Sequence, residues 1–336
     1  RCQPMHRDRR VAVGVEVSGG KTTVALIDQY GRVIQRVHAK TLRGRPASAT
    51  LDPYVRAIDD MLTAARADGL TICGISVSIP GTLDAAQRRP LNVSMLPSLN
   101  GFPLCNYLET RYHLPAQLLV DVDAALLGEH RFGAGKGFQR LLFLTVNAVV
   151  GASLVVDGQL ERSERGYMGH VCHLPVATSG PRCSCGKRGC INTLVSTDAM
   201  QKMVQRALRR GDETSLTQRL LNREYFSAQL LAEEAERGDG VALQIYSELA
   251  RWLGSAILKY IGLCEPEMLI LNGALLSAND LLLVRLRSVL ATQALAVERH
   301  SVVEIVPARL GSDAALIGAV VPHFDLPSRD VVKMCI

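Results

Sequence analysis

The chain of 336 residues has few aromatic residues, 4% of the total with a single tryptophan, and no long uninterrupted hydrophobic run. Its longest apolar stretch, residues 141–156, is interrupted by polar residues and a glycine. A membrane-spanning helix needs about 20 apolar residues, so this stretch predicts buried strand. No charged-then-apolar signal segment opens the chain. These absences argue against a membrane partner and favour a cytoplasmic location.

Cysteine is also sparse, and neither sign of charge dominates. Nine cysteines are too few for a disulfide framework in a chain of this length. Lysine and arginine number 38 against 32 acidic residues, which gives a formal net charge of +6. The densest basic groups are Arg7, Arg9 and Arg10, followed by Arg43 and Arg45. Such thinly spread charge is typical of a solvated surface rather than of a nucleic-acid interface.

What the chain does contain is the material for two folded domains. Hydrophobic residues make up 48% and charged residues 21%, which excludes a disordered chain. Alternating residues predict an antiparallel meander over 11–17, 22–28 and 32–40. A helix from 53 to 66 and a strand at 72–79 follow. A similar succession of strands and helices recurs later, so we expect two α/β domains of related design.

A cluster of cysteines carries the strongest chemical signal. It is a C-x-C-x4-C motif made by Cys183, Cys185 and Cys190. Structural zinc takes four nitrogen or sulfur ligands, so the motif lacks one. His170 is the favoured fourth ligand, with His173 and Cys172 as rivals. The alternative is a set of thiols that bind no metal.

Two further features could handle phosphate or protons. Residues 18–22 form a glycine-rich turn, but Val15 stands where a Walker motif needs glycine. The turn either cradles phosphate through its backbone or is a plain hairpin. Asp121 and Asp123 follow a predicted strand and precede a helix. They fit a general base, or, for Asp123 especially, a helix N-cap.

Taken in order, these motifs resemble the ROK family of sugar kinases and sugar-responsive repressors. The likeness runs from about residue 11 to 321, and its most specific part is Gly169-His170 followed by Cys183–Cys190, similar to the family's zinc signature. Supporting motifs include residues 79–81, 128–135 and 237–239. The resemblance implies an actin-like, ribonuclease-H-like α/β fold of two domains with a cleft between them. It also implies homo-oligomers, dimers or tetramers, and a structural Zn²⁺.

The resemblance also suggests domain boundaries. They are a basic arm at 1–10, a first domain at 11–120 completed by 312–325, a second domain at 121–311 with the zinc loop at 170–190, and a tail at 326–336.

The family's phosphate-binding loops are altered in this chain. The first loop, D-x-G-G-T-K in family kinases, begins here with Glu16 and retains Gly19 and Lys21. The second loop, G-T-G-x-G-G-G, is represented by residues 147–153, where only Gly151 survives. A third glycine run is reduced to Gly273 and its neighbours. Because backbone N–H groups must approach phosphates closely, these losses predict that ATP is not bound.

The sugar-binding positions are altered as well. Tyr167 and Asn192 align with the glutamates of the family's E-x-G-H and G-C-x-E motifs, and Ser98 aligns with its asparagine. Asp121, the family's catalytic base, and His170 are retained. We expect a sugar or sugar phosphate to contact these five side chains.

These departures lead to a prediction about function. The chain is expected to be no enzyme but the effector and oligomerisation domain of a ROK-type transcriptional regulator, sensing a sugar-like metabolite or a protein partner. DNA would be reached only through an N-terminal helix-turn-helix domain, which this chain lacks. The alternative is an ATP-dependent kinase for a hexose or an amino sugar, with Asp121 as general base.

Overall fold

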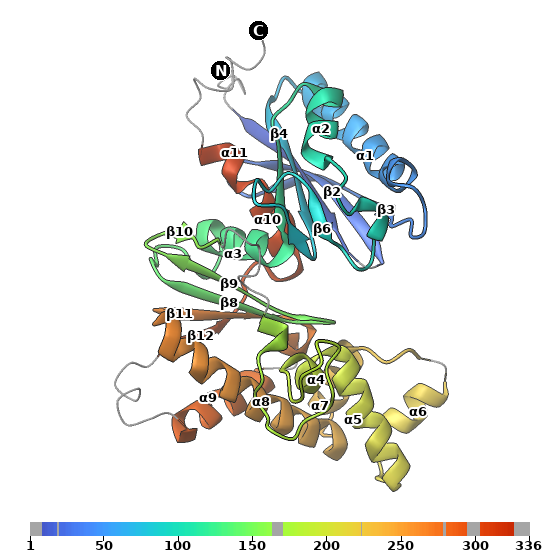
Figure 1. Ribbon diagram of the computed structural model, residues 1–336, viewed down its shortest axis with the longest axis vertical. Coiled ribbons are helices and arrows are strands. Elements are labelled where there is room, and N and C mark those ends of the chain that lie inside the picture. Colours follow the sequence, from blue (N-terminus) through green and yellow to red (C-terminus); the bar gives the residue numbers. More distant parts are fainter. Residues whose placement is uncertain are drawn as a thin grey trace, which may run out of the picture. The chain divides into compact units, whose positions relative to one another are not determined.

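The chain forms two compact units in a computed structural model (Figure 1). The structure describes residues 9–18, 20–162, 171–222, 224–277, 280–293 and 303–325. Among these, unit 1 comprises 9–137, 160–162 and 312–325. Unit 2 comprises 138–159 and 171–311.

Unit 1 is built on a five-stranded mixed sheet in the order β3-β2-β1-β4-β7. The strands are β1 (Arg10–Val17), β2 (Lys21–Asp28), β3 (Val33–Lys40), β4 (Thr71–Ile79) and β7 (Ala116–Val120). The first three are antiparallel, as the alternating sequence predicts, whereas β1, β4 and β7 run parallel. The central strands are almost wholly buried, which is expected for a sheet covered on both faces.

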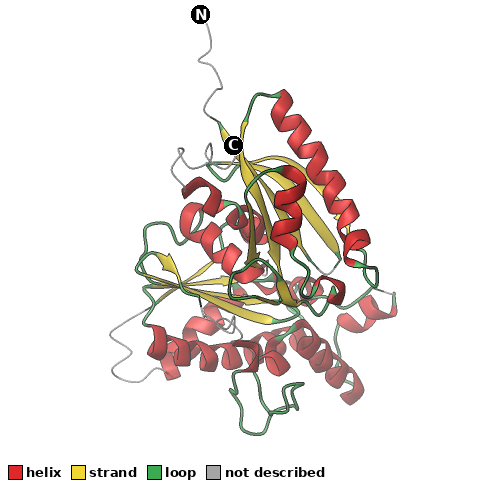
Figure 2. Ribbon diagram, turned by 45° about the horizontal axis from the view of Figure 1, so that its top comes forward, coloured by secondary structure: helices red, strands yellow, loops and turns green. Residues whose placement is uncertain are grey.

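Helices cover both faces of this sheet (Figure 2). One face packs against α1 (Ala47–Ala67) and α2 (Leu104–Tyr112), around a core that includes Ile58, Met61 and Ile75. Helix α1 begins before Pro53 rather than at it, so the predicted start was six residues late. A small hairpin, β5 (Thr82–Leu83) with β6 (Pro90–Asn92), follows β4.

The opposite face is covered by α3 (Asp121–Phe132), α10 (Ala314–Ala319) and α11 (Val321–Asp325). Helices α3 and α10 cross at two glycines. A Cβ on Gly128 would lie 2.6 Å from the carbonyl oxygen of Ala314, and one on Gly318 would collide with the carbonyl of Ala124. The predicted domain boundary at 120/121 is therefore wrong. It lies at 137/138, because this crossing holds α3 in unit 1.

The predicted N-terminal arm is also partly incorrect. Arg10 is the first residue of β1, and its guanidinium donates to the carbonyl of His323 at 2.9 Å. Arg9 pairs with Asp28 at 2.8 Å. Both arginines are thus engaged within unit 1. Residues 1–8 and the predicted tail at 326–336 lie outside the described residues.

Unit 2 contains a second five-stranded sheet in the order β10-β9-β8-β11-β12. Its strands are β8 (Leu141–Val146), β9 (Val150–Val156), β10 (Gln159–Leu160), β11 (Met268–Asn272) and β12 (Glu304–Pro307). The long apolar stretch at 141–156 is therefore a buried strand pair, as predicted. No helix in the described part of the chain is long and apolar enough to cross a membrane.

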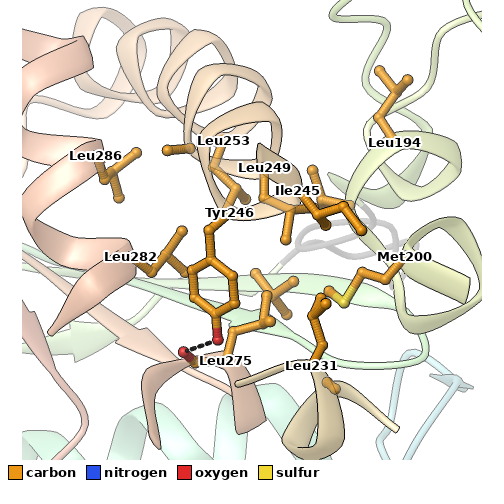
Figure 3. Close-up of a cluster of buried hydrophobic side chains, with 14 of the residues drawn as sticks. Leu194, Met200, Leu231, Ile245, Tyr246, Leu249, Leu253, Leu275, Leu282 and Leu286 are labelled. Carbon is orange, nitrogen blue, oxygen red and sulfur yellow. Dashed lines mark hydrogen bonds between the residues drawn. The ribbon is translucent and has the colours of Figure 1, made fainter. Parts of the chain in front are cut away.

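Six helices follow in unit 2 among its described residues. They are α4 (Asn192–Val195), α5 (Thr197–Arg210), α6 (Leu216–Leu221), α7 (Ala228–Glu236), α8 (Gly240–Cys264) and α9 (Leu281–Gln293). Side-chain oxygens of Ser196, Ser227 and Asp239 accept from backbone N–H groups to cap α5, α7 and α8. The core of the unit surrounds Tyr246 on α8, whose hydroxyl donates to the carbonyl of Leu275 at 3.0 Å (Figure 3).

Removing the hydroxyl of Tyr246 is expected to destabilise the protein. Tyr246→Phe leaves the buried Leu275 carbonyl without this donor and should cost about 1–2 kcal/mol. Tyr260→Phe on the same helix is the matched control, since the Tyr260 hydroxyl is buried without a hydrogen-bond partner among the described residues. The control should be neutral or stabilising in urea denaturation. Equal losses in both variants would contradict this account of the Tyr246 hydrogen bond.

Candidate functional site

Three carboxylates gather at one edge of the unit 1 sheet. Glu16 is near the carboxyl end of β1, and Asp121 directly follows the parallel strand β7. Because carboxyl ends of parallel strands meet at one edge, these side chains are brought together. Asp313, in the turn before α10, joins them and pairs with Arg36 at 2.6 Å. We refer to Glu16, Asp121 and Asp313 as the carboxylate cluster.

The cluster changes the acidity of Glu16. Burial, followed by the negative charges of Asp121 and Asp313, raises the pKa of Glu16 to about 7. The positive charges of Arg36 and Lys21 oppose this shift. Near neutral pH the Glu16 carboxyl is therefore partly protonated and partly ionised. Such shifted pKa values are common at functional sites.

Asp121 is the first residue of α3. Burial raises its pKa, while the backbone N–H of Val122, 2.9 Å from its carboxylate, lowers it. The positive end of the helix dipole also favours a negative charge here. Asp123 lies within the first turn rather than at the N-cap, which is Val120, so the capping prediction for Asp123 is wrong.

Other predicted residues of unit 1 occupy defined places. Lys21 is exposed at the start of β2, and its carbonyl accepts from the Ser18 hydroxyl at 2.6 Å. Gly19 lies outside the described residues. Ser98 is half-buried, and its hydroxyl is 3.4 Å from that of Thr50 at the start of α1.

The cysteine motif of unit 2 folds into a compact cluster. Ligand atoms of His173, Cys183, Cys185 and Cys190 all lie within 4.8 Å of one another. The Cys183 sulfur is 3.3 Å from Nδ1 of His173, and the Cys185 and Cys190 sulfurs are 3.6 Å apart. One imidazole and three thiols in this arrangement suit a tetrahedral zinc ion.

The backbone of the cysteine loop, residues 181–190, explains the arrangement. The N–H of Val176 donates to the carbonyl of Gly189 at 2.8 Å, and the N–H of Ile191 donates to Leu174 at 2.8 Å. Gly189 has φ +68°, and a Cβ there would collide with the Ala177 carbonyl. This pairing holds the segment after His173 against the cysteine loop.

His173, the rival candidate, therefore completes the cluster among the described residues. The predicted ligand His170 lies outside them, as does Tyr167. If His173 is the histidine of the E-x-G-H motif, the glutamate position three residues earlier falls on His170 rather than Tyr167.

Hydrogen bonding lowers the pKa of Cys183. Desolvation opposes this effect, but the backbone N–H of Cys185 and the side chains of Cys185, His173 and Cys190 outweigh it. The thiolate is the form that binds metal. The Cys183 sulfur is therefore readily deprotonated to the form that can bind a metal ion.

The β8–β9 hairpin, residues 147–151, is held by hydrogen bonds to the first residues of α4 and α5. Asn192 accepts from the Val150 N–H at 2.9 Å, and the Thr197 N–H donates to the Asn147 carbonyl at 3.1 Å. Val149 at the tip is 56% exposed. Gly151 lies within β9, opposite Thr145. The Val150 N–H, which an open phosphate loop would present, is already bonded to a side chain.

Gly273 follows β11 at the remaining predicted loop. Its N–H donates to the Asn272 side chain at 2.9 Å. The structure thus also pairs this amide within the chain.

Sequence reasoning missed a basic surface on α5. Lys202, Arg206 and Arg209 follow one another at intervals of four and three, so they share a helix face. With Arg182 of the cysteine loop, they line a groove of about 650 Å³. We refer to it as the basic groove. The helical spacing alone could have identified three of the four cations.

Comparison with known proteins places this geometry in a family. A family model described as "ROK family" matches residues 12–322. A glucokinase of Thermotoga maritima is 26% identical over 91% of this chain and 95% of its own length. The xylose repressor of Bacillus spizizenii is 23% identical over 96% of this chain and 79% of its own length.

A solved structure shows the same fold. It is a ROK family transcriptional regulator described as a homolog of the E. coli MLC protein, with a TM-score of 0.85 and 22% identity. The match covers 98% of this chain and 81% of that one. The predicted actin-like α/β fold is confirmed by this likeness.

The prediction that the chain is not an enzyme is wrong by this comparison. Glucokinases align with it over nearly their whole length, at an identity as high as that of the repressors. Loss of loop glycines is therefore not sufficient ground for excluding phosphoryl transfer.

Replacing Glu16 by glutamine is expected to remove a pH-dependent loss of stability. With a folded pKa of about 7 and an unfolded value of 4.5, the folded chain binds more protons between these pH values. Its stability therefore falls as pH rises through this window, by up to about 3 kcal/mol. Glu16→Gln should match the wild type near pH 4.5 and exceed it near pH 8.

The measurement is the urea midpoint across this pH range. Glu304→Gln, at an exposed position of unit 2, controls for loss of a carboxylate alone. A Glu16→Gln effect of the same size at every pH would show that the Glu16 carboxyl is not shifted.

Proposed function

This chain belongs to the ROK family, and we propose that it is a sugar kinase that transfers a phosphate group from an ATP-type donor to a hexose hydroxyl. The observation that carries the proposal is the carboxylate of Asp121, at the first turn of α3 beside Glu16 and Asp313. The similarity to glucokinases supports it.

In the proposed reaction, Asp121 acts as the general base. Its carboxylate accepts the proton of the sugar hydroxyl while that oxygen forms a bond to the terminal phosphorus. The bond between this phosphorus and the bridging oxygen breaks, and its electron pair leaves with the diphosphate. A carboxylate with a raised pKa suits this transfer, because it is a stronger base than a solvated one.

The neighbouring charges assist the donor. Lys21, exposed beside the first turn, supplies positive charge for the phosphates. Glu16 and Asp313 are oxygen donors of the type preferred by the Mg²⁺ that accompanies nucleoside triphosphates. Since the Val150 amide is bonded to Asn192, we expect fewer backbone contacts to the donor and a high KM for it.

Asp121→Asn tests the proposed base. Loss of proton acceptance should lower kcat about 10²–10⁴-fold while sugar affinity changes little. Asp123→Asn, which alters the same charge in the same helical turn, is the matched control and should stay within a few-fold of wild type. ADP release with glucose, other hexoses and amino sugars is the measurement. Turnover that Asp121→Asn leaves unchanged would contradict the assignment.

A second candidate function is sugar sensing within a transcriptional regulator. The hairpin tip Ala148–Val149–Val150 favours it, since none of these residues has the positive φ that an open glycine loop adopts. The fold likeness to a ROK regulator supports it. In that role the chain would form a homo-oligomer and reach DNA through a separate domain. Calorimetry that finds sugar binding but no effect of ATP would favour this candidate.

We also propose that the cysteine cluster holds one structural Zn²⁺ through His173, Cys183, Cys185 and Cys190. Bound zinc would lock the cysteine loop onto the segment after His173. Cys190→Ser should lose the metal and lower the melting temperature. Cys264→Ser, at a half-buried thiol outside the cluster, should retain both. Elemental analysis decides, and full zinc content in Cys190→Ser would refute the ligand set.

A further inference from the structure

The basic groove of unit 2 lies between α5 and the cysteine loop, next to the β8–β9 hairpin. Its polar wall includes Arg182, Ser184, Thr193, Lys202, Arg206 and Arg209. All of its lining residues belong to unit 2, so this unit forms the groove by itself. A volume of about 650 Å³ is in the range of sites for small molecules.

The charges in the groove are not balanced. Four cationic side chains line it against one acid, Asp198, which pairs with Lys202 at 2.6 Å. Within the described part of the chain, Arg182, Arg206 and Arg209 form no ion pair with a carboxylate. Other arginines of unit 2 do. Arg210, Arg219 and Arg237 are paired with Asp212, Glu224 and Glu234.

The cationic face also has an energetic cost for the helix. Lys202 and Arg206 are four residues apart and Arg209 three further on, spacings at which like charges repel by some tenths of a kcal/mol per pair. The ion pair of Lys202 with Asp198 offsets part of this repulsion. The Arg206 Nε donates to the Lys202 carbonyl at 3.3 Å, so its guanidinium lies along the helix. A bound anion would relieve the repulsion.

Helix α5 adds to the positive potential. Ser196, Asp198 and Ala199, at its N-terminus, line one end of the groove. The backbone dipoles of a 14-residue helix place partial positive charge at this end. The Ser196 hydroxyl is engaged with the Ala199 N–H at 3.3 Å. The Thr193 hydroxyl already donates to the carbonyl of Cys190 at 2.8 Å. Anion contacts therefore fall to the guanidinium groups and to Ser184.

From these observations we propose that the basic groove is a binding site for a phosphate-bearing small molecule. Several guanidinium groups around one space match phosphate, which accepts paired N–H donors. Because Ala148 and Asn192 also line the groove, a bound molecule would contact the β8–β9 hairpin. None of the four cations has a part in the proposed kinase reaction, so variants of these side chains test the groove separately from that reaction.

Calorimetric titration with inorganic pyrophosphate tests the site. The double variant Arg206→Ala/Arg209→Ala should bind pyrophosphate at least about tenfold more weakly, since each loses charged hydrogen bonds. Arg210→Ala is the matched control. It removes the same charge from the next residue of the same helix but does not line the basic groove. The control should bind within about twofold of wild type.

Further titrations identify the class of ligand and distinguish the basic-groove proposal from the kinase proposal. Glucose 6-phosphate, ADP and tripolyphosphate, each competing with pyrophosphate, identify whether a sugar phosphate, a nucleotide or a polyphosphate fits best. Asp121→Asn should bind pyrophosphate as the wild type does, whether or not the kinase proposal holds. Weakening by Asp121→Asn, or equal weakening by Arg210→Ala and the double variant, would overturn the proposed site. Melting temperatures confirm that every variant is folded.

Discussion

The close crossing of α3 and α10 is the constraint on which the first unit depends. Only hydrogen at Gly128 and Gly318 allows the two backbones to approach this closely. The crossing also places Leu316 and Val320 against the face of the sheet that is opposite α1 and α2. It also directs the starts of both helices toward the end of β1. The carboxylate cluster therefore depends on this packing. A side chain inserted at the crossing would lower the stability of unit 1 and change the pKa of Glu16 together.

In the second unit, one short segment links three features. Asn192 follows Cys190 by two residues, is the first residue of α4 and holds the β8–β9 hairpin through the Val150 amide. The next helix begins at Thr197 and carries the basic face. The cysteine loop, the β8–β9 hairpin and the basic groove are thus all connected through this one segment. Movement of the cysteine loop would reach the hairpin through two residues of backbone and the hydrogen bond from the Val150 N–H to Asn192.

Local patterns were predictable, whereas choices between distant partners were not. The cysteine motif and the strands at 141–156 are readable because their spacing is local. The position of His173 beside the three cysteines depends on backbone pairing between Val176 and Gly189, which the sequence does not display. The domain boundary depends on Gly318, far along the chain from α3. The sequence alone shows Glu16 only as a changed loop residue, because its raised pKa arises from burial and from charged neighbours on other elements.

The order in which the chain leaves the ribosome bears on how it folds. Unit 2 is almost continuous in sequence, from 138 to 311, and can assemble as soon as that length has emerged. Unit 1 has to wait, because α10 and α11 come from residues 314–325. Until they arrive, Ala12, Ala25 and Ile27 on its sheet have no cover from Leu316 and Phe324. Nascent chains paused before residues 314–325 emerge would expose an apolar sheet face, to which chaperones can bind.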